Sequence, residues 1–161
     1  MPKIDLAAVP VKSGSSYPAP YAAMVAGRSS LRLGEAGGLT QFGANVTILA
    51  PGSLSSMRHW HAREDEFVMM LTGTCVLVED GGETVMRPGD CAAFPAGVAD
   101  GHHFRNDGAE EARFLVVGSR SPVEDVTYSD VDMRFTKTPG GTAYTRRDGS
   151  PFPADAPSSK P

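Results

Sequence analysis

Alternating apolar and polar positions mark short β-strands through the middle of the chain. In residues 39–50, LTQFGANVTILA, apolar side chains recur at every second position and share one face: Phe42, Ala44, Val46 and Ile48. This period of two predicts a strand. Seven further segments of strand length follow, at residues 55–61, 66–73, 74–80, 83–88, 91–95, 102–106 and 113–120. The middle of the chain is therefore expected to be a succession of strands.

Turn residues separate these segments. DGGE at 80–83 lies between two of them and predicts a hairpin. The chain holds 18 Gly and 13 Pro, which favours many short strands over long helices. Strands of four to eight residues with turns every eight to twelve are typical of an antiparallel sandwich or small barrel. We therefore expect an all-β fold.

Composition divides the chain into three parts. Residues 1–38 have little periodicity and predict an N-terminal arm with one short strand or a turn of helix. Residues 39–121 hold the regular pattern and form the predicted barrel core. Residues 122–161 predict a C-terminal extension, and its last dozen residues, rich in Pro, Ser and Ala, are expected to be disordered.

The net charge and the cysteine content limit the classes of function that the protein can have. The net charge of −4 signals no basic face, so no nucleic-acid partner is expected. No apolar run has the length of a signal peptide or a membrane span, which predicts a cytoplasmic protein without membrane contact. Cys75 and Cys91 form no metal-binding spacing, and we interpret both as small buried apolar residues.

All four histidines of the chain lie in two short segments, RHWHAREDEF and GVADGHHFRN. In a strand, His59 and His61 point to the same face, and Glu66 follows five residues later at the head of the next strand. His102 or His103 reaches the same point if the second segment folds beside the first. Three imidazoles and one carboxylate suit Fe, Mn, Ni, Cu, Co or Zn. The pattern predicts one divalent metal ion per chain.

Other polar residues near the predicted site have weaker support as functional residues. Glu64 and Asp65 are interpreted as solvated charges. Gln41 and Asn45 lie on the polar face of the first predicted strand and are candidates to point inward. Tyr128, Tyr144 and Arg58 are candidate acids or bases, although Arg58 shares the face of Trp60, away from the predicted metal, and the catalytic residues are left unknown.

The spacing of these residues resembles the two motifs of the cupin family. G-x6-HxH-x4-E-x6-G runs from Gly52 to Gly73, and G-x5-PxG-x4-H-x3-N runs from Gly89 to Asn106. The residues within these motifs are similar to those of stand-alone bacterial cupins of the cupin 2 type with unassigned function. The resemblance implies a double-stranded β-helix, a jelly-roll barrel, with a metal ion inside.

By motif position, the resemblance implies His59, His61, Glu66 and a histidine of the second motif as ligands. Four residues separate PxG from that histidine instead of the usual two. The spacing back from Asn106 nevertheless favours His102, because His102-x3-Asn106 keeps the family pattern. Neighbours in a strand face opposite ways, so His103 is expected to point away from the ion.

The resemblance also implies a function and an assembly. We expect a metal-dependent cupin acting on a small molecule, of the oxygenase, isomerase, decarboxylase or lyase type. The alternatives are a non-catalytic module that binds or senses a small ligand, and a barrel that the metal only braces. Cupins commonly form homodimers, and the arm SYPAPYAAM and the FLVV strand are candidates to cover sheet edges in such a dimer.

Overall fold

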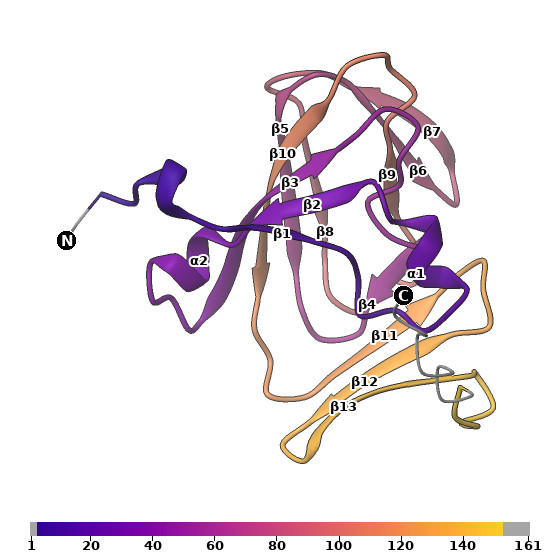
Figure 1. Cartoon of the computed structure of the whole chain (residues 1–161). Coiled ribbons are helices and arrows are strands. Elements are labelled where there is room, and N and C mark those ends of the chain that lie inside the picture. Colours follow the sequence, from indigo (N-terminus) through magenta and orange to yellow (C-terminus); the bar gives the residue numbers. More distant parts are fainter. Residues whose placement is uncertain (1–2, 153–161) are drawn as a thin grey trace, which may run out of the picture.

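Antiparallel β-sheets make up most of the regular secondary structure, as Figure 1 shows in the computed structural model, which describes residues 3–152. The largest sheet has six strands, in the spatial order β1 (Val11–Ser13), β2 (Arg28–Leu31), β3 (Phe42–Leu49), β10 (Ala112–Ser119), β5 (Glu66–Thr72) and β8 (Cys91–Phe94). A second sheet contains β13 (Gly141–Thr145), β12 (Arg134–Thr138), β11 (Glu124–Tyr128) and β4 (His59–His61). A third contains β7 (Gly82–Met86), β6 (Cys75–Glu79) and β9 (His103–Arg105).

The pairing joins strands that are far apart in the sequence. β3 pairs with β10 and β4 pairs with β11, while the predicted hairpin forms between β6 and β7. All of these pairs are antiparallel. Such long-range antiparallel pairing defines a jelly-roll barrel, and the predicted all-β class is confirmed. Each of the eight predicted strands is present, from β3 through β10.

Helices are short in the described part of the chain. They are the 3-10 turn η1 (Leu6–Ala8), α1 (Tyr21–Met24) and α2 (Leu33–Ala36). Among residues 3–152, no helix is long and apolar enough to cross a membrane.

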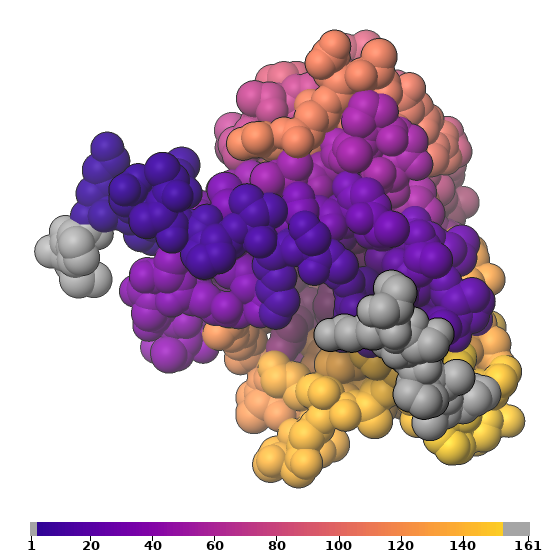
Figure 2. All heavy atoms as spheres, viewed as in Figure 1, coloured from indigo at the N-terminus to yellow at the C-terminus, as the bar shows by residue number. Residues whose placement is uncertain are grey.

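Segments on both sides of the predicted core take part in its sheets. β2 extends the six-stranded sheet by pairing with β3, and β11 supports β4. Figure 2 shows the N-terminal segment lying across one face of the barrel, with the C-terminal strands beyond it and a hollow between the two. The predicted disorder at the end of the chain falls mostly on residues 153–161, outside the described residues.

Alternation along the strands separates the core from the outer surface. On β5, Val68 and Met70 point into a core that also contains Leu49, Phe104 and Phe114. Their neighbours point outward, with exposed fractions of 40% for Phe67, 36% for Met69 and 40% for Leu71. The N-terminal segment covers part of the same outer surface, where Val9 and Leu31 pack on Val46 and Ile48. The outward side chains of β5 remain exposed.

Two expectations about single elements are wrong. Cys75 is buried as predicted, but Cys91 is exposed, because it pairs with Met69 and shares its outward face. The strand that contains FLVV is β10, which lies between β3 and β5 and therefore presents no free edge. The edges of the six-stranded sheet are β1 and β8.

Candidate metal centre

Strand β4 brings His59 and His61 to the same face. It is held by β11 on one side, where Tyr128 pairs with His59, and by a backbone bridge to His102 on the other. The His59 N–H donates to the His102 carbonyl at 3.1 Å, and the His102 N–H donates to the His59 carbonyl at 2.9 Å. The rings of His59 and His61 lie 5.0 Å apart between centroids. The predicted strand geometry is therefore present.

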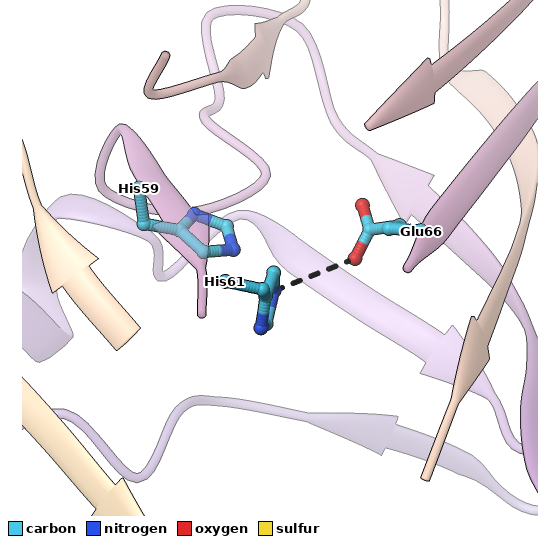
Figure 3. A group of neighbouring side chains, drawn as sticks. All are labelled: His59, His61 and Glu66. Carbon is cyan, nitrogen blue, oxygen red and sulfur yellow. Dashed lines mark ion pairs between the residues drawn. The ribbon is translucent and has the colours of Figure 1, made fainter. Parts of the chain in front are cut away.

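Glu66 faces these histidines from the first residue of β5, as Figure 3 shows. Its Oε2 lies 3.9 Å from Nε2 of His61, and its Oε1 lies 3.4 Å from Nε2 of His102. Nitrogen atoms of His59 and His61 and a carboxylate oxygen of Glu66 all lie within 4.8 Å of one another. Three donors from two strands thus converge on one point, and His102 adjoins them through Glu66.

The adjacent histidines of the second segment have different surroundings. The His102 side chain is buried, and its ring stacks on Phe94 with centroids 3.5 Å apart. His103 starts β9, and Phe104, which shares the face of His102, packs into the core. Burial lowers the pKa of His103, and the charged groups acting on it are Asp130, Arg105 and Arg58. His103 therefore faces a different set of groups from the cluster around Glu66.

The protonation state of His59 allows it to bind a metal ion. The Nδ1 of His59 lies 2.9 Å from the Met57 carbonyl, which only accepts, so Nδ1 carries the proton and Nε2 has a free lone pair. Burial, together with the charges of His61 and His102, lowers the pKa of His59 to about 3. His59 is therefore neutral at pH 7, as a metal ligand must be.

Glu66 is ionised in the same cluster. Burial alone would raise its pKa, but the hydrogen bond with His102 and the charges of the three histidines lower it below the usual value. Neutral imidazoles with one carboxylate form a donor set for divalent transition metals. The residues present therefore fit a single divalent ion.

A second carboxylate, that of Glu124, lies near His61. Nδ1 of His61 and Oε2 of Glu124 are both buried and have no hydrogen-bond partner within residues 3–152. His61, Glu64 and Glu124 also have ligand atoms within 4.8 Å of one another. Oε1 of Glu124 accepts from the backbone N–H groups of Ala62 and Arg63 at 3.0 and 3.1 Å. Glu124 is thus held beside His61.

Glu64 is not the solvated charge that its sequence context predicted. It accepts from the Ser121 N–H at 2.8 Å and from Lys137 at 3.2 Å, which ties the loop before β5 to the C-terminal extension. Glu124 itself had no signal in the sequence, because it lies in that extension, far from either motif. Only the pairing of β11 with β4 reveals its position.

The cluster lines two connected cavities. The inner one encloses about 240 Å³, and its wall includes His59, His61, Glu66 and His102. The outer one encloses about 490 Å³ and again includes His59 and His61. Asn45 lines both cavities, in agreement with its predicted inward direction, whereas Gln41 is exposed.

Tyrosines cover one side of the two cavities. The ring of Tyr128 lies 5.7 Å from that of His59, and Tyr17 meets Tyr128 edge-on at 5.5 Å. Burial raises the pKa of Tyr17 to about 12 and also raises that of Tyr128. Both hydroxyls therefore keep their protons near neutral pH and can donate hydrogen bonds. Tyr144 lines the outer cavity and makes a hydrogen bond with Ser16 at 3.1 Å.

Sequence reasoning missed the contribution of the N-terminal arm. Arg28, Ser30 and Arg32 alternate along RSSLR and all line the outer cavity. This period-two pattern was a signal for a strand with a polar inner face. It lies among prolines, serines and glycines, which indicated an irregular segment.

A jelly-roll barrel with a cluster of histidines and a glutamate inside it defines the class to which this protein belongs. The family model for the cupin domain matches residues 45–118. A structure described as a sugar phosphate isomerase from a cupin superfamily, from Silicibacter pomeroyi, is 55% identical, with 96% of this chain and 98% of that chain covered and a TM-score of 0.92. This chain therefore belongs to the cupin superfamily.

More distant structures share the fold. A putative sugar phosphate isomerase from Acidithiobacillus ferrooxidans is 29% identical, with 80% of this chain and 81% of that chain covered and a TM-score of 0.71. The polyketide cyclase RemF from Streptomyces resistomycificus is 22% identical, covering 81% of this chain and 87% of its own, with a TM-score of 0.65. Among curated proteins, none matches this chain significantly.

Proposed function

We propose that this chain is a metal-dependent enzyme acting on a small molecule, with one divalent ion held by His59, His61, Glu66 and His102. The observation that carries the proposal is the convergence of these side chains at the junction of two cavities. A barrel with an apolar core does not need four polar side chains inside for stability. Their presence beside an open cavity favours chemistry on a ligand.

Isomerisation is the reaction type that we favour among the four expected from the sequence. Two similar structures, at 55% and 29% identity, carry descriptions as sugar phosphate isomerases, one of them putative. An aldose–ketose isomerisation moves protons without net oxidation, so it needs no redox cofactor. When bound, a divalent ion would polarise an oxygen of the substrate. Tyr17 and Tyr128, which stay protonated, would donate hydrogen bonds to oxygens of a bound sugar.

Metal analysis and turnover test this proposal together. We expect about one divalent ion per chain after mild purification. We also expect interconversion of aldose and ketose phosphates, measured by NMR, that chelation abolishes and metal restores. A protein that stays metal-free in the presence of Mn, Fe, Ni and Zn would overturn the metal assignment. Turnover that survives complete chelation would overturn metal dependence.

A non-catalytic ligand-binding or sensing cupin is the second candidate function. The observation that favours it is the same cavity beside the histidine cluster, which suits binding as well as turnover. This candidate predicts saturable binding of a small molecule to the metal-loaded protein without any change in the ligand. Recovery of the ligand intact after prolonged incubation would distinguish it from the enzyme.

We further propose that the protein is a homodimer. Support comes from the exposed apolar side chains of β5, Phe67, Met69 and Leu71, which lie in a row on the outer face of the largest sheet. Exposed apolar patches of this kind mark interaction surfaces. A test at the level of single residues is given in the Discussion.

A further inference from the structure

The outer cavity has a basic wall in a chain that is acidic overall. Its lining includes four cationic side chains, Lys12, Arg28, Arg32 and Arg120. Among the described residues that line it, Glu35 is the only carboxylate, and it is already paired with Arg32 at 2.8 Å. The whole chain carries a net charge of −4. Positive charge is therefore concentrated at the mouth of the barrel, where it attracts anions.

Arg28 is the most deeply placed of these cations. It pairs with Leu49, a core residue, so its side chain is on the inner face of the sheet. Its Nε is buried and has no hydrogen-bond partner within residues 3–152. By contrast, Arg58 and Arg105 both form ion pairs with carboxylates. A buried donor without an acceptor is costly, so the geometry favours a ligand that supplies one.

Lys12 and Ser30 extend the basic wall from Arg28. Lys12 pairs with Ser30, and Ser30 pairs with Thr47, so all three share the inner face with Arg28. Lys12 forms no ion pair with any of the described residues, although it lines the same cavity. Ser15, Ser16 and Ser30 also line this cavity and add hydroxyl groups to the wall. Several donors around more than one cation suit an anion with several oxygens.

The basic wall and the histidine cluster line two cavities that share wall residues. Arg28 and Tyr17 line both the outer and the inner cavity, as do His59 and His61. A small molecule in the outer cavity is therefore within reach of both. Its anionic group would lie at Arg28 and Lys12, and its uncharged part would point to the histidines.

We propose that Arg28 and Lys12 bind the phosphate group of a phosphorylated small molecule. A phosphomonoester carries up to two negative charges and three terminal oxygens, which fits two cations and the adjacent hydroxyls better than a carboxylate does. The inference rests on the proposed function, because it takes the other end of the ligand to lie at the histidine cluster. It adds the group by which the protein recognises that ligand.

Calorimetric titration with ribose 5-phosphate, ribonate, ribose and inorganic phosphate tests the proposal. Phosphate also binds metal ions, so the titrations use the full chain both loaded with metal and treated with chelator. The two variants are Arg28→Gln and Lys12→Gln. Lys12 is exposed, so its substitution does not threaten folding. The matched control is Arg87→Gln, which removes the same charge at a turn outside the cavity.

We expect ribose 5-phosphate and inorganic phosphate to compete for one site, and ribose to bind at least about 10-fold more weakly. Arg28→Gln and Lys12→Gln should each weaken phosphate binding about 10-fold or more, while Arg87→Gln and the metal content stay unchanged. Equal phosphate affinity in Arg28→Gln and Arg87→Gln would overturn the proposal, as would ribonate binding as tightly as ribose 5-phosphate. Loss of metal binding with phosphate binding retained would instead refute the proposed function alone.

Discussion

His102 and His103 are neighbours in sequence with different chemical surroundings. Only His102 contacts Glu66, with 3.4 Å between Nε2 and Oε1. We predict that His102→Ala loses most of the bound metal, because a ligand is removed. His103→Ala should keep the metal and change stability only modestly. Elemental analysis of the two purified variants decides between them, and a metal-free His103→Ala with a loaded His102→Ala would reverse the assignment.

Glu124 gives a second prediction at the scale of one residue. A ligand atom of Glu124 lies within 4.8 Å of one of His61, and Oε2 of Glu124 and Nδ1 of His61 both lack a partner within residues 3–152, so this carboxylate is suited to accept the proton of that ring. Partners of this kind orient a ligand histidine and raise its basicity. Glu124→Gln should lower metal affinity by about 10- to 100-fold without unfolding the protein. The control is Glu83→Gln, which lies on β7 and pairs with Arg105; competition with a fluorescent chelator should show no change for it.

The low pKa of His59 makes the metal-free protein sensitive to acid. In the unfolded chain its pKa is about 6.5, and in the folded chain it is about 3. Between these values the unfolded state binds the proton and the folded state does not, so stability falls as the pH falls. From pH 7 to pH 5 we expect His59 to account for a loss of about 2 kcal/mol. Urea unfolding of chelator-treated protein measures this, and His59→Gln should have a flatter profile.

The site residues differ in how far sequence could predict them. The period of a strand brings His59 and His61 together, and Glu66 follows only five residues later at the head of the next strand. Arg28, Tyr17 and Glu124 reach the site only because β2 and β11 pair with distant strands. No local pattern encodes such pairing. The sequence therefore indicated where a metal would bind but not what surrounds a ligand.

At the scale of the element, the turn between β5 and β6 depends on Gly73. Its φ of +70° lies in the left-handed region, and a Cβ there would be 2.7 Å from the Glu111 carbonyl oxygen. Gly89 has a φ of +92° but open space around it. Both substitutions to alanine cause backbone strain. The difference between their losses of stability therefore measures the clash of the Cβ at position 73 with the Glu111 carbonyl oxygen. We predict that Gly73→Ala lowers the unfolding free energy by at least about 2 kcal/mol more than Gly89→Ala.

Chemical denaturation of the two alanine variants checks this prediction. Equal losses would mean that the segment before β10 moves away without cost. Gly73, Gly89 and Gly97 all lie within the two motif stretches and have positive φ values, as glycines in tight turns do. The strands of the arms were harder to predict. β2 and the C-terminal strands lie among prolines, serines and glycines, and their sheet partners come from other parts of the chain.

At the scale of the whole molecule, the exposed row on β5 should hold two copies together. Burying Phe67, Met69 and Leu71 against a second copy removes apolar surface from water, which favours association. Light scattering at roughly tens of micromolar should give twice the mass of the 16.9 kDa chain. Met69→Lys should give a monomer that keeps its metal. Val85→Lys, at an exposed position of β7, should remain a dimer; a monomeric wild type would exclude this surface as an interface.

The wall of the outer cavity and the cluster at its floor come from different stretches of the chain. His59, His61, Glu66 and His102 lie within residues 45–118, whereas Lys12, Arg28 and Tyr144 lie outside them. The flanking segments can therefore vary, and alter what the outer cavity accepts, while the histidine cluster stays the same. The same separation makes the barrel suitable for exchange of its flanking segments. Exchanging both flanks between two related proteins should transfer ligand preference without rebuilding the histidine cluster.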